Sequence, residues 1–357
     1  MSDESILLVT GRQVETALAG RHKQIIDVIR GAYEAHGRQA DTLPQASILR
    51  FADHPRNRII ALPARLDLGT DTGDTADTAG VKWISSFPAN TETGLERASA
   101  VILMNSMRTG RVTAVIEGSV ISAKRTAASA ALAAAEVHGA SRPGVLGLIG
   151  CGRINYEILQ FILAAGPAVR SVIVYDQSAS RADAFVRRCA VAAPDLAIGR
   201  AGTAAEVLGT CSLVSFATTA TEPYVTDLSM CPPGSTILHI SLRDIAPSAI
   251  LDAENLVDDV DHVCAARTSV HLAEQAVGHR RFIRTTICDV LLGRTTARAD
   301  AALPLVFSPF GMGTLDIALA GLVLETARAE APAVPDFWPM AWQSDAPAAA
   351  SARRVAP

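Results

Sequence analysis

The segment that most constrains the fold of this chain is a glycine-rich turn between an apolar run and an amphipathic run. Residues 145–149 read Val-Leu-Gly-Leu-Ile, and Gly150-Cys-Gly152 follows them directly. Residues 154–165 then have the apolar spacing of a helix. Strand, tight turn and helix in this order are typical of the first unit of a dinucleotide-binding sheet, where the helix N-terminus faces a pyrophosphate.

A second strand, predicted for residues 172–175, ends at Asp176. An acid at this position accepts hydrogen bonds from ribose hydroxyls and repels a 2′-phosphate, so we expect NAD rather than NADP, although nearby Arg181 softens that preference. Asn155 stands where the motif prefers Gly or Ala, and we expect it to hold helix and strand slightly further apart. A plain glycine turn, with Asp176 as a helix cap, remains the alternative.

The remaining pattern divides the chain in two. Before residue 118, one helix (24–33) precedes short strands at residues 47–51, 58–62, 80–85, 100–105 and 112–117, which predicts a largely antiparallel or mixed sheet. Residues 119–137 are rich in helix formers and predict a connecting helix. Beyond them, helix 181–192 and strands 213–217 and 236–241 continue the alternation. We therefore predict an α/β protein with a Rossmann doubly wound parallel sheet and a second, α+β domain.

Composition excludes several classes of protein. Hydrophobic residues make up 49% and charged residues 19% of the 357 residues, and the net charge is −4, which argues against a disordered chain or a general polyanion binder. No apolar run reaches the length of a membrane helix. The acidic start of the chain lacks the basic residues of a secretory signal, so we expect a cytoplasmic protein. The Ala/Pro-rich tail, residues 331–357, is expected to stay unordered without a partner.

No metal site is predicted. The six cysteines form no C-x-x-C pair, and nothing near His262 and Cys264 completes a zinc site, so both are interpreted as structural. The acidic loop at residues 67–78 lacks the calcium-binding ladder of an EF-hand, and a solvated hairpin loop is favoured over a calcium site.

Three ionisable residues lie in apolar surroundings. Lys82 is on a predicted strand, Arg125 is in the Ala-rich helix, and Asp244 follows the strand at residues 236–241. Buried charges need partners, and a cationic pair facing a carboxylate suits an amino acid. Alternatively, Lys82 extends to solvent from an edge strand and Arg125 makes an ordinary ion pair. Thr218 follows another strand, at the edge where cofactor and substrate meet, or is a plain turn residue.

These segments occur in the order seen in the ornithine cyclodeaminase/mu-crystallin family, which the chain resembles over residues 5–330. The matching stretches are the Lys82 strand, Ser-Ala-Lys-Arg-Thr-Ala-Ala at residues 122–128, the glycine loop, Ser-Leu-Arg-Asp at residues 241–244 and Phe-Gly-Met-Gly-Thr-Leu-Asp at residues 310–316. Lys124 departs from the family pattern, which has an apolar residue there.

The resemblance implies a homodimer. Residues 1–125, completed by residues 313–330, would form the substrate-binding and dimerisation domain, and residues 140–310 an NAD-binding Rossmann domain. It implies that Lys82 and Arg125 bind the substrate carboxylate and that Asp244 is the catalytic acid, while Arg50 is a weaker match to a further carboxylate-binding arginine. The cofactor-binding residues expected from the motif and the resemblance together are Gly150, Gly152, Arg153, Ile154, Asp176, Thr218, Ser241 and Gly311.

Four stretches, at residues 58–63, 80–84, 95–105 and 174–177, resemble those family members that cleave an N-substituted glutamate oxidatively. The products of those members are 2-oxoglutarate and 2,3-diaminopropionate, a siderophore and antibiotic precursor. The resemblance implies oxidation at the glutamyl α-carbon with NADH formation, with Lys82 and Asp244 catalytic and Arg97 holding another carboxylate. Cyclodeamination of ornithine, ketimine reduction and non-catalytic binding of a nicotinamide cofactor and a small ligand remain open.

Overall fold

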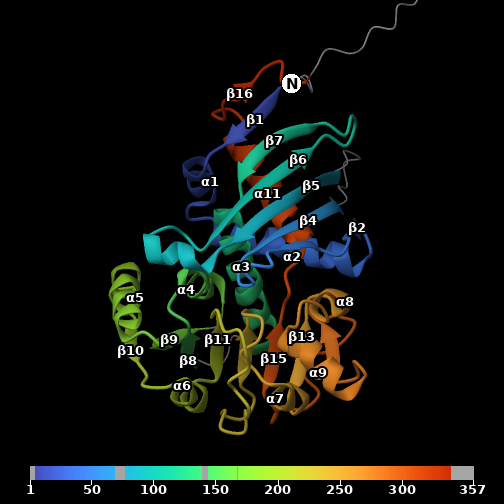
Figure 1. Ribbon diagram of the computed structural model, residues 1–357. Helices are drawn as coiled ribbons and strands as arrows, with labels where there is room; N and C mark the ends of the chain where they lie inside the picture. Colours follow the sequence, from blue (N-terminus) through green and yellow to red (C-terminus); the bar gives the residue numbers. More distant parts are fainter. Residues whose placement is uncertain (1–4, 69–76, 139–143, 167, 339–357) are drawn as a thin grey trace, which may run out of the picture.

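The computed structural model describes residues 5–68, 77–138, 144–166 and 168–338, and most of the predicted loop at residues 67–78 lies outside these ranges. Two sheets of eight strands each form the two halves of the molecule (Figure 1). The chain is therefore a mixed α/β protein, as the sequence predicts.

The first sheet has the strand order β16-β1-β7-β6-β5-β4-β2, with β3 paired to β4. Only the β1–β7 pair is parallel among the pairings described. Its strands are β1 (Ile6–Val9), β2 (Asp41–Thr42), β3 (Ser47–Arg50), β4 (Arg58–Asp67), β5 (Asp77–Ser86), β6 (Ala98–Asn105), β7 (Val112–Glu117) and β16 (Ala333–Val334). The helices of this half are α1 (Gly11–Leu18), α2 (His22–Gly37), the short 3₁₀ helix η1 (Pro88–Thr93), α3 (Ser119–His138) and α11 (Gly313–Ala327).

One face of this sheet packs on α11, which contacts β4, β5 and β6. Alternate side chains of the strands, such as Ile102, Met104 and Ile116, are buried there. Helix α11 is itself buried almost all round, because it lies between this sheet and α2. A charged residue on α11 is therefore held deep inside the protein.

The second sheet has the strand order β10-β9-β8-β11-β12-β15-β13-β14, and every pairing in it is parallel. Its strands are β8 (Gly144–Ile149), β9 (Val169–Tyr175), β10 (Ala197–Arg200), β11 (Leu213–Phe216), β12 (Thr236–His239), β13 (Glu254–Val257), β14 (Ile283–Thr286) and β15 (Leu305–Ser308). The helices are α4 (Arg153–Ala165), α5 (Ala179–Ala192), α6 (Ala204–Thr210), α7 (Pro247–Leu251), α8 (Val260–Val263), α9 (Ser269–Val277) and α10 (Ile287–Leu291). The strand order reverses between β8 and β11, which is where doubly wound sheets bind ligands.

Helix α3 connects the two halves and packs against both α2 and α4. Its buried face consists largely of alanines, whose small side chains let neighbouring helices approach closely. Lys124, the departure from the family pattern, pairs with Glu157 of α4 at 3.1 Å. Its charge is therefore satisfied within this helix contact.

Both sheets contain strands that the sequence pattern did not predict. Strands β1, β2, β10, β13, β14 and β15 have no counterpart among the predicted strands. The tail was expected to lack order from residue 331, but Ala333–Val334 pairs with β1, and the backbone N–H of Leu8 donates to Pro332 O. The exposed edge of β1 supplies the hydrogen bonds that the tail composition does not predict. Residues 339–357 lie outside the described ranges.

None of the helices in the described ranges is both long and apolar enough to cross a bilayer. These residues also contain no group of three or more His, Cys, Asp or Glu side chains placed to hold a metal ion. All six cysteines are free thiols within the described ranges.

Candidate functional site: a glycine loop and two charged clusters

The glycine loop lies at the reversal of the strand order. Gly150 follows β8 with a φ of +95°, and a Cβ there would come within 2.5 Å of Ala217 O, so no other residue fits. Gly152 is the N-cap of α4, and a Cβ added to it meets nothing within 4 Å. Open space therefore lies directly in front of the positive end of a 13-residue helix.

Asp176 directly follows β9 and holds this loop. One of its carboxylate oxygens accepts from the backbone N–H of Cys151 at 2.8 Å, and the other accepts from that of Ser178 at 2.9 Å. Each carboxylate oxygen can accept more than one hydrogen bond, so ribose hydroxyls can still bind. Asp176 thus serves as a loop anchor as well as the predicted ribose acceptor.

Asn155 is fully buried and ties the loop to two strands. Its Nδ2 donates to Ile149 O at 2.9 Å and to Gly150 O at 2.8 Å, and its Oδ1 accepts from Ser215 Oγ at 2.7 Å. The motif prefers Gly or Ala here for close packing, but this chain instead fixes the glycine turn with three side-chain hydrogen bonds.

The other residues of the predicted cofactor set surround this turn. Arg153 begins α4, and its Nη2 lies 3.9 Å from Glu15 of α1. Ile154 packs against the main hydrophobic core. Their backbone N–H groups belong to the first turn of α4, where helical donors have no carbonyl partner of their own.

Lys82 and Arg125 meet at a buried carboxylate that the sequence analysis did not single out. Asp316 on α11 accepts from Lys82 Nζ at 2.5 Å and lies 3.2 Å from Arg125 Nε. Lys82 is 2% exposed and Asp316 is fully buried. One negative charge thus faces two positive ones, and the group keeps a net positive charge inside the protein.

Burial lowers the pKa of Lys82 to about 8. Asp316 opposes this effect and raises the pKa, whereas neighbouring Arg125 lowers it further. Lys82 therefore remains mostly protonated at neutral pH and loses its proton in mildly alkaline solution. Such a cation is suited to hold a carboxylate.

Asp244 lies in the loop after β12, in a second cluster of polar side chains. Its Oδ1 accepts from the hydroxyls of Thr218 and, at 3.1 Å, Tyr224. Its Oδ2 accepts from Ser241 Oγ at 2.5 Å and lies 3.5 Å from His239 Nε2. Predicted residues Thr218 and Ser241 therefore contact Asp244 directly, and within the described residues no hydrogen bond or ion pair joins Asp244 to Lys82 or Arg125.

Burial alone would raise the pKa of Asp244, but the close contact with His239 and the hydrogen bonds from Ser241 and Thr218 outweigh it and lower the pKa. Burial and the Asp244 charge raise the pKa of Tyr224, so its hydroxyl stays protonated as a donor. Asp244 is therefore an ionised carboxylate at neutral pH. It can stabilise a positive charge or accept a proton from a bound group.

The chain after β15 connects the two clusters. His239 Nδ1 lies 3.2 Å from Ser308 Oγ, and Ser308 is the last residue of β15. Three residues later Gly311 has a φ of +91°, and a Cβ there would come within 2.6 Å of Arg125 Nη1. A side chain at this position would displace the guanidinium, so the predicted cofactor residue Gly311 also shapes the Arg125 site.

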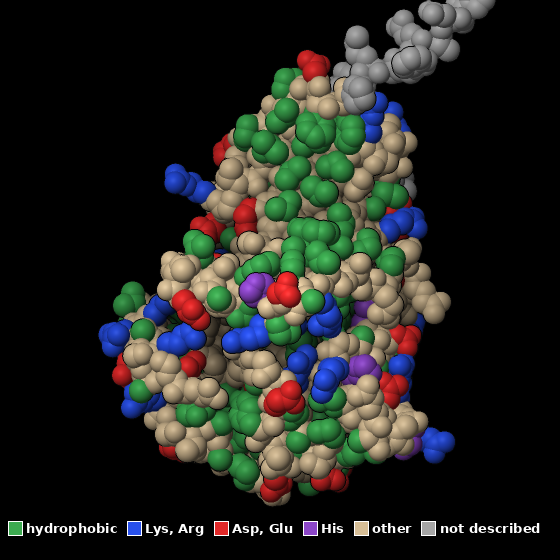
Figure 2. Space-filling view, in the orientation of Figure 1, with side chains coloured by type: hydrophobic (Ala, Val, Ile, Leu, Met, Phe, Trp, Pro, Cys, Tyr) green, Lys and Arg blue, Asp and Glu red, His purple; other side chains and the backbone are tan. Residues whose placement is uncertain are grey.

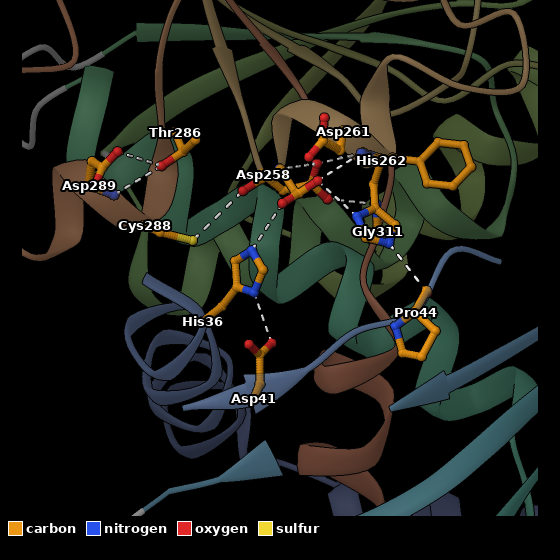
Figure 3. Close-up of polar contacts among 12 residues, drawn as sticks. His36, Asp41, Pro44, Asp258, Asp261, His262, Thr286, Cys288, Asp289 and Gly311 are labelled. Atoms are coloured by element: carbon orange, nitrogen blue, oxygen red, sulfur yellow. Dashed lines mark hydrogen bonds and ion pairs between the residues drawn. The ribbon is translucent and has the colours of Figure 1, made fainter. Parts of the chain in front are cut away.

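A further cluster fixes this segment and joins the two halves of the molecule (Figure 3). Buried Asp258 accepts from the backbone N–H groups of Phe310 at 3.0 Å and Gly311 at 2.6 Å. Its neighbour Asp259 lies 3.2 Å from His36 Nε2 of α2.

His36 lies between two acids from opposite halves. Its Nδ1 contacts Asp41 at 2.8 Å, and Asp259 also contacts His262 Nδ1 at 2.8 Å. Hydrogen bonds to Asp259 and Asp41 raise the pKa of His36 to about 10. His262, which the sequence analysis interpreted as structural, is therefore part of a charged contact between the halves.

The structure places the two remaining predicted residues at one end of the first sheet. Arg50 is exposed at the end of β3, and Arg97 donates from Nη1 to Ser86 Oγ at 2.8 Å. Neither reaches Lys82 or Arg125 through a described hydrogen bond.

Sequence reasoning missed Asp316, Tyr224 and His239. Asp316 is within a stretch already singled out by resemblance, and a lone acid in an otherwise apolar helix was the available signal. Tyr224 and His239 carry no such signal, because only folding brings them to Asp244.

Comparison with known proteins places this site in a family. The family model described as ornithine cyclodeaminase/mu-crystallin family matches residues 9–331. A Staphylococcus aureus protein named N-((2S)-2-amino-2-carboxyethyl)-L-glutamate dehydrogenase is 28% identical over 335 residues, which cover 91% of this chain and 96% of that protein.

Two solved structures share the fold. Thermococcus litoralis Δ(1)-pyrroline-2-carboxylate reductase, solved with NADH and L-proline, has a TM-score of 0.81 at 22% identity and covers 91% of this chain and 98% of its own. An archaeal alanine dehydrogenase dimer with bound NAD has a TM-score of 0.80 at 23% identity and covers 94% of this chain and 100% of its own. Because the family model spans most of the sequence, the chain belongs to the ornithine cyclodeaminase/mu-crystallin family.

Proposed function

We propose that this protein is an NAD-dependent dehydrogenase that cleaves N-(2-amino-2-carboxyethyl)-L-glutamate oxidatively. Substrate, NAD⁺ and water would yield L-2,3-diaminopropionate, 2-oxoglutarate, NADH and a proton. The similarity to the Staphylococcus aureus dehydrogenase over nearly the whole of both chains supports the choice of substrate.

The glycine loop fits a dinucleotide. Gly150, Gly152 and the first N–H groups of α4, contributed by Arg153 and Ile154, would hold the pyrophosphate, and Asp176 the ribose. NAD supplies the hydride acceptor when it is bound there. The acid at position 176 favours NAD over NADP, because it would repel a 2′-phosphate.

The observation that carries the proposal is the buried group of Lys82, Asp316 and Arg125. Two cations share one carboxylate, and a second carboxylate from the substrate would neutralise the remaining charge. Binding the glutamyl α-carboxylate here would fix the α-hydrogen for transfer, and fixed orientation contributes several kcal/mol to catalysis.

Asp244 would act on the substrate nitrogen and on water. Loss of hydride from the α-carbon leaves a positive iminium, which an ionised carboxylate stabilises. Water then adds to the carbon, Asp244 takes up its proton, and the C–N bond breaks with a proton returned to the departing amine. The hydroxyls of Thr218, Ser241 and Tyr224 hold the carboxylate in place for both transfers.

The test is incubation of purified protein with NAD and the synthetic substrate. We expect absorbance of NADH to rise in step with 2,3-diaminopropionate and 2-oxoglutarate, identified by mass spectrometry. Ornithine is the parallel control: a cyclodeaminase would release proline and ammonia from it without net NADH. Binding of NAD with no consumption of either amino acid would favour the non-catalytic alternative.

We also propose that two copies of the chain associate through the outer face of the first sheet. One row of paired residues across five strands is entirely apolar, namely Pro63, Val81, Leu103, Val115 and Leu8. Beside it Trp83 is 48% exposed and Val101 is 38% exposed. Figure 2 shows this hydrophobic surface on the upper half of the molecule. The related archaeal alanine dehydrogenase is a dimer, which supports a second copy as the occupant.

A further inference from the structure

Four arginines from separate elements gather at one end of the first sheet, outside the Lys82 group. Arg50 of β3 pairs with Arg58 of β4, and Arg58 pairs with Ser86 of β5. Residues opposite each other in antiparallel strands share a face, so both arginines project on the same side as Ser86. The hydroxyl of Ser86 accepts from Arg97. From the loop after β12, Arg243 comes near the same place, because its charge acts on Arg58.

The proximity of Arg243 is visible in the electrostatics. Burial lowers the pKa of Arg58, and the charges of Arg97, Arg243 and Arg50 lower it further in that order. Burial also lowers the pKa of Arg243, followed by the charges of Arg267 and Arg50, while Glu222 opposes them.

The described part of the chain contains no acid that is paired with this cluster. Glu222 raises the pKa of Arg243, and Glu96 raises that of Arg97, but among the described residues neither forms an ion pair with any of the four arginines. Figure 2 shows basic side chains gathered along the boundary between the two halves, where these elements meet. Like charges held close together and partly buried favour the binding of an anion.

Two of the guanidinium groups hold a buried donor without an acceptor. The Nε atoms of Arg58 and Arg243 are buried, and no described protein group accepts from them. Arg243 is nevertheless fixed in place, because its Nη atoms donate to Ala266 O at 3.0 Å and Thr221 O at 3.4 Å. Buried donors are nearly always paired in proteins, and a carboxylate pairs well with the planar guanidinium fork.

The cluster lies at a suitable distance from the reacting site. Ser86 is on the same face of β5 as Lys82 and four residues further along, about 13 Å at roughly 3.3 Å per residue. In the second half of the molecule, Arg243 immediately precedes Asp244. A substrate with several carboxylates would reach both cation groups if its amine lay near Asp244.

We propose that Arg58 and Arg243, together with Arg97, form a second carboxylate site that selects amines with two or more carboxylates. This inference rests on the proposed function, because it takes the Lys82 group to hold the α-carboxylate of the same molecule. A monocarboxylic amino acid such as alanine, proline or ornithine leaves the arginines without a counterion. The second site thus restricts the enzyme to substrates of the N-carboxyalkyl-glutamate class.

The test compares Arg58→Gln and Arg243→Gln with Arg56→Gln, a matched loss of charge at an exposed arginine near the same strand. For the tricarboxylate substrate we expect KM to rise about 100-fold in the first two variants, with kcat within about threefold and Arg56→Gln unchanged. Arg58→Lys keeps the positive charge but lacks the planar guanidinium group, so its KM should lie between those of the wild type and Arg58→Gln. Thermal unfolding identifies any variant that fails to fold.

A binding measurement separates this inference from the proposed reaction. By calorimetry with NAD present, the wild type should bind 2-oxoglutarate, and Arg58→Gln and Arg243→Gln should bind it about 100-fold more weakly. Inorganic phosphate should compete only weakly, because a tetrahedral anion does not span to the Lys82 group; equal competition would assign the cluster to phosphate and overturn the inference.

The two possible failures are distinct. If the wild type turns over the tricarboxylate and both variants match Arg56→Gln, the second site is wrong while the reaction stands. If the wild type produces no NADH but binds 2-oxoglutarate through these arginines, the site stands and the proposed reaction is wrong. If it neither reacts nor binds, both are wrong.

Discussion

Asp316 links the two cations of the proposed carboxylate site and sets the protonation of one of them. Because its charge raises the pKa of Lys82 against the effect of burial, its loss should release the Lys82 proton at lower pH. The carboxylate site is therefore not simply a pair of positive charges. Its strength depends on pH through the protonation of Lys82.

We expect kcat/KM for the amino-acid substrate to fall above about pH 8, tenfold per pH unit, as Lys82 loses its proton. In Asp316→Asn the fall should begin at lower pH. Glu325→Gln, an exposed acid on the same helix, is the matched control and should follow the wild type. A profile that stays flat to pH 9.5, or an unshifted one in Asp316→Asn, would show that Lys82 does not hold the substrate.

Asp244 is the residue on which the proton transfers depend. Asp244→Asn should lower kcat by a factor of 10² to 10⁴, which is the usual contribution of a general acid or base. NAD binding, followed by fluorescence titration, should change by less than about threefold. Asp195→Asn, an exposed acid in the same half, should keep full activity. Near-normal turnover by Asp244→Asn would remove it from the mechanism.

The sequence identified Lys82, Arg125 and Asp244 because each is a charged residue in apolar surroundings. It did not predict that Lys82 and Arg125 share Asp316, since that contact spans 234 residues of sequence from Lys82 and depends on how α11 packs. It also could not show that Arg58 and Arg243 lie near each other, because they come from different halves of the molecule. Residue type is visible in a sequence, whereas register and helix packing are not.

At the scale of elements, the glycine turn and its helix were predictable because strand, turn and helix are adjacent in sequence. The function of Asn155 was not, since two of its partners, Ile149 and Ser215, are on different strands. Similarly, β13 (Glu-Asn-Leu-Val) and β14 (Ile-Arg-Thr-Thr) lack the apolar run that marks β8, and β15 (Leu-Val-Phe-Ser) is apolar but only four residues long. Their place in the sheet depends on pairing with distant strands rather than on local sequence.

The end of α2 contacts the second half of the molecule through His36, and this contact should make stability depend on pH. The pKa of His36 is raised to about 10, so its contribution is complete below its ordinary value of 6.5 and is lost as pH rises through 10. The pKa of Asp259 is lowered by hydrogen bonds from His262 and His36 that outweigh burial, so its contribution is lost only in acid, below the ordinary value of 3.8.

We expect His36→Gln to lower stability by about 2 kcal/mol near pH 7, after allowance for the partial exposure of the histidine. With about 2 cal/mol/K of unfolding entropy per residue, this corresponds to about 3 °C in Tm. Differential scanning calorimetry of variant and wild type should show the difference vanishing above pH 10. A difference that persists there would mean that packing, not charge, accounts for the effect.

For the whole molecule, the two-sheet division follows from the change of pattern near residue 118, and the sequence predicted it. The apolar outer face of the first sheet was not apparent, because β4 to β7 contain continuous apolar stretches whose second face has no cover among the described elements. A sheet with two apolar faces must have each face covered by another element or by another chain. Helix α11 packs on one face, and we assign the other to a second copy of the chain.

Trp83→Glu combined with Val101→Glu should therefore convert a dimer into a monomer, measured by size-exclusion chromatography with light scattering. Opposing carboxylates on a buried face repel one another, and the apolar contact is lost. Val191→Glu is the matched control, because Val191 is 86% exposed on α5 in the other half. A wild type that is already monomeric at micromolar concentration, or a double variant that stays dimeric, would contradict this assignment.

The most direct test of the proposed hydride transfer follows the hydrogen atom on the glutamyl α-carbon. N-(2-amino-2-carboxyethyl)-L-glutamate carrying deuterium at the glutamyl α-carbon is incubated with the protein and NAD, and the products are analysed by mass spectrometry and NMR. The site described above predicts one deuterium at C4 of the reduced nicotinamide and none in 2,3-diaminopropionate. Deuterium that stays on the glutamyl α-carbon, or is exchanged into water while NAD remains oxidised, would contradict it.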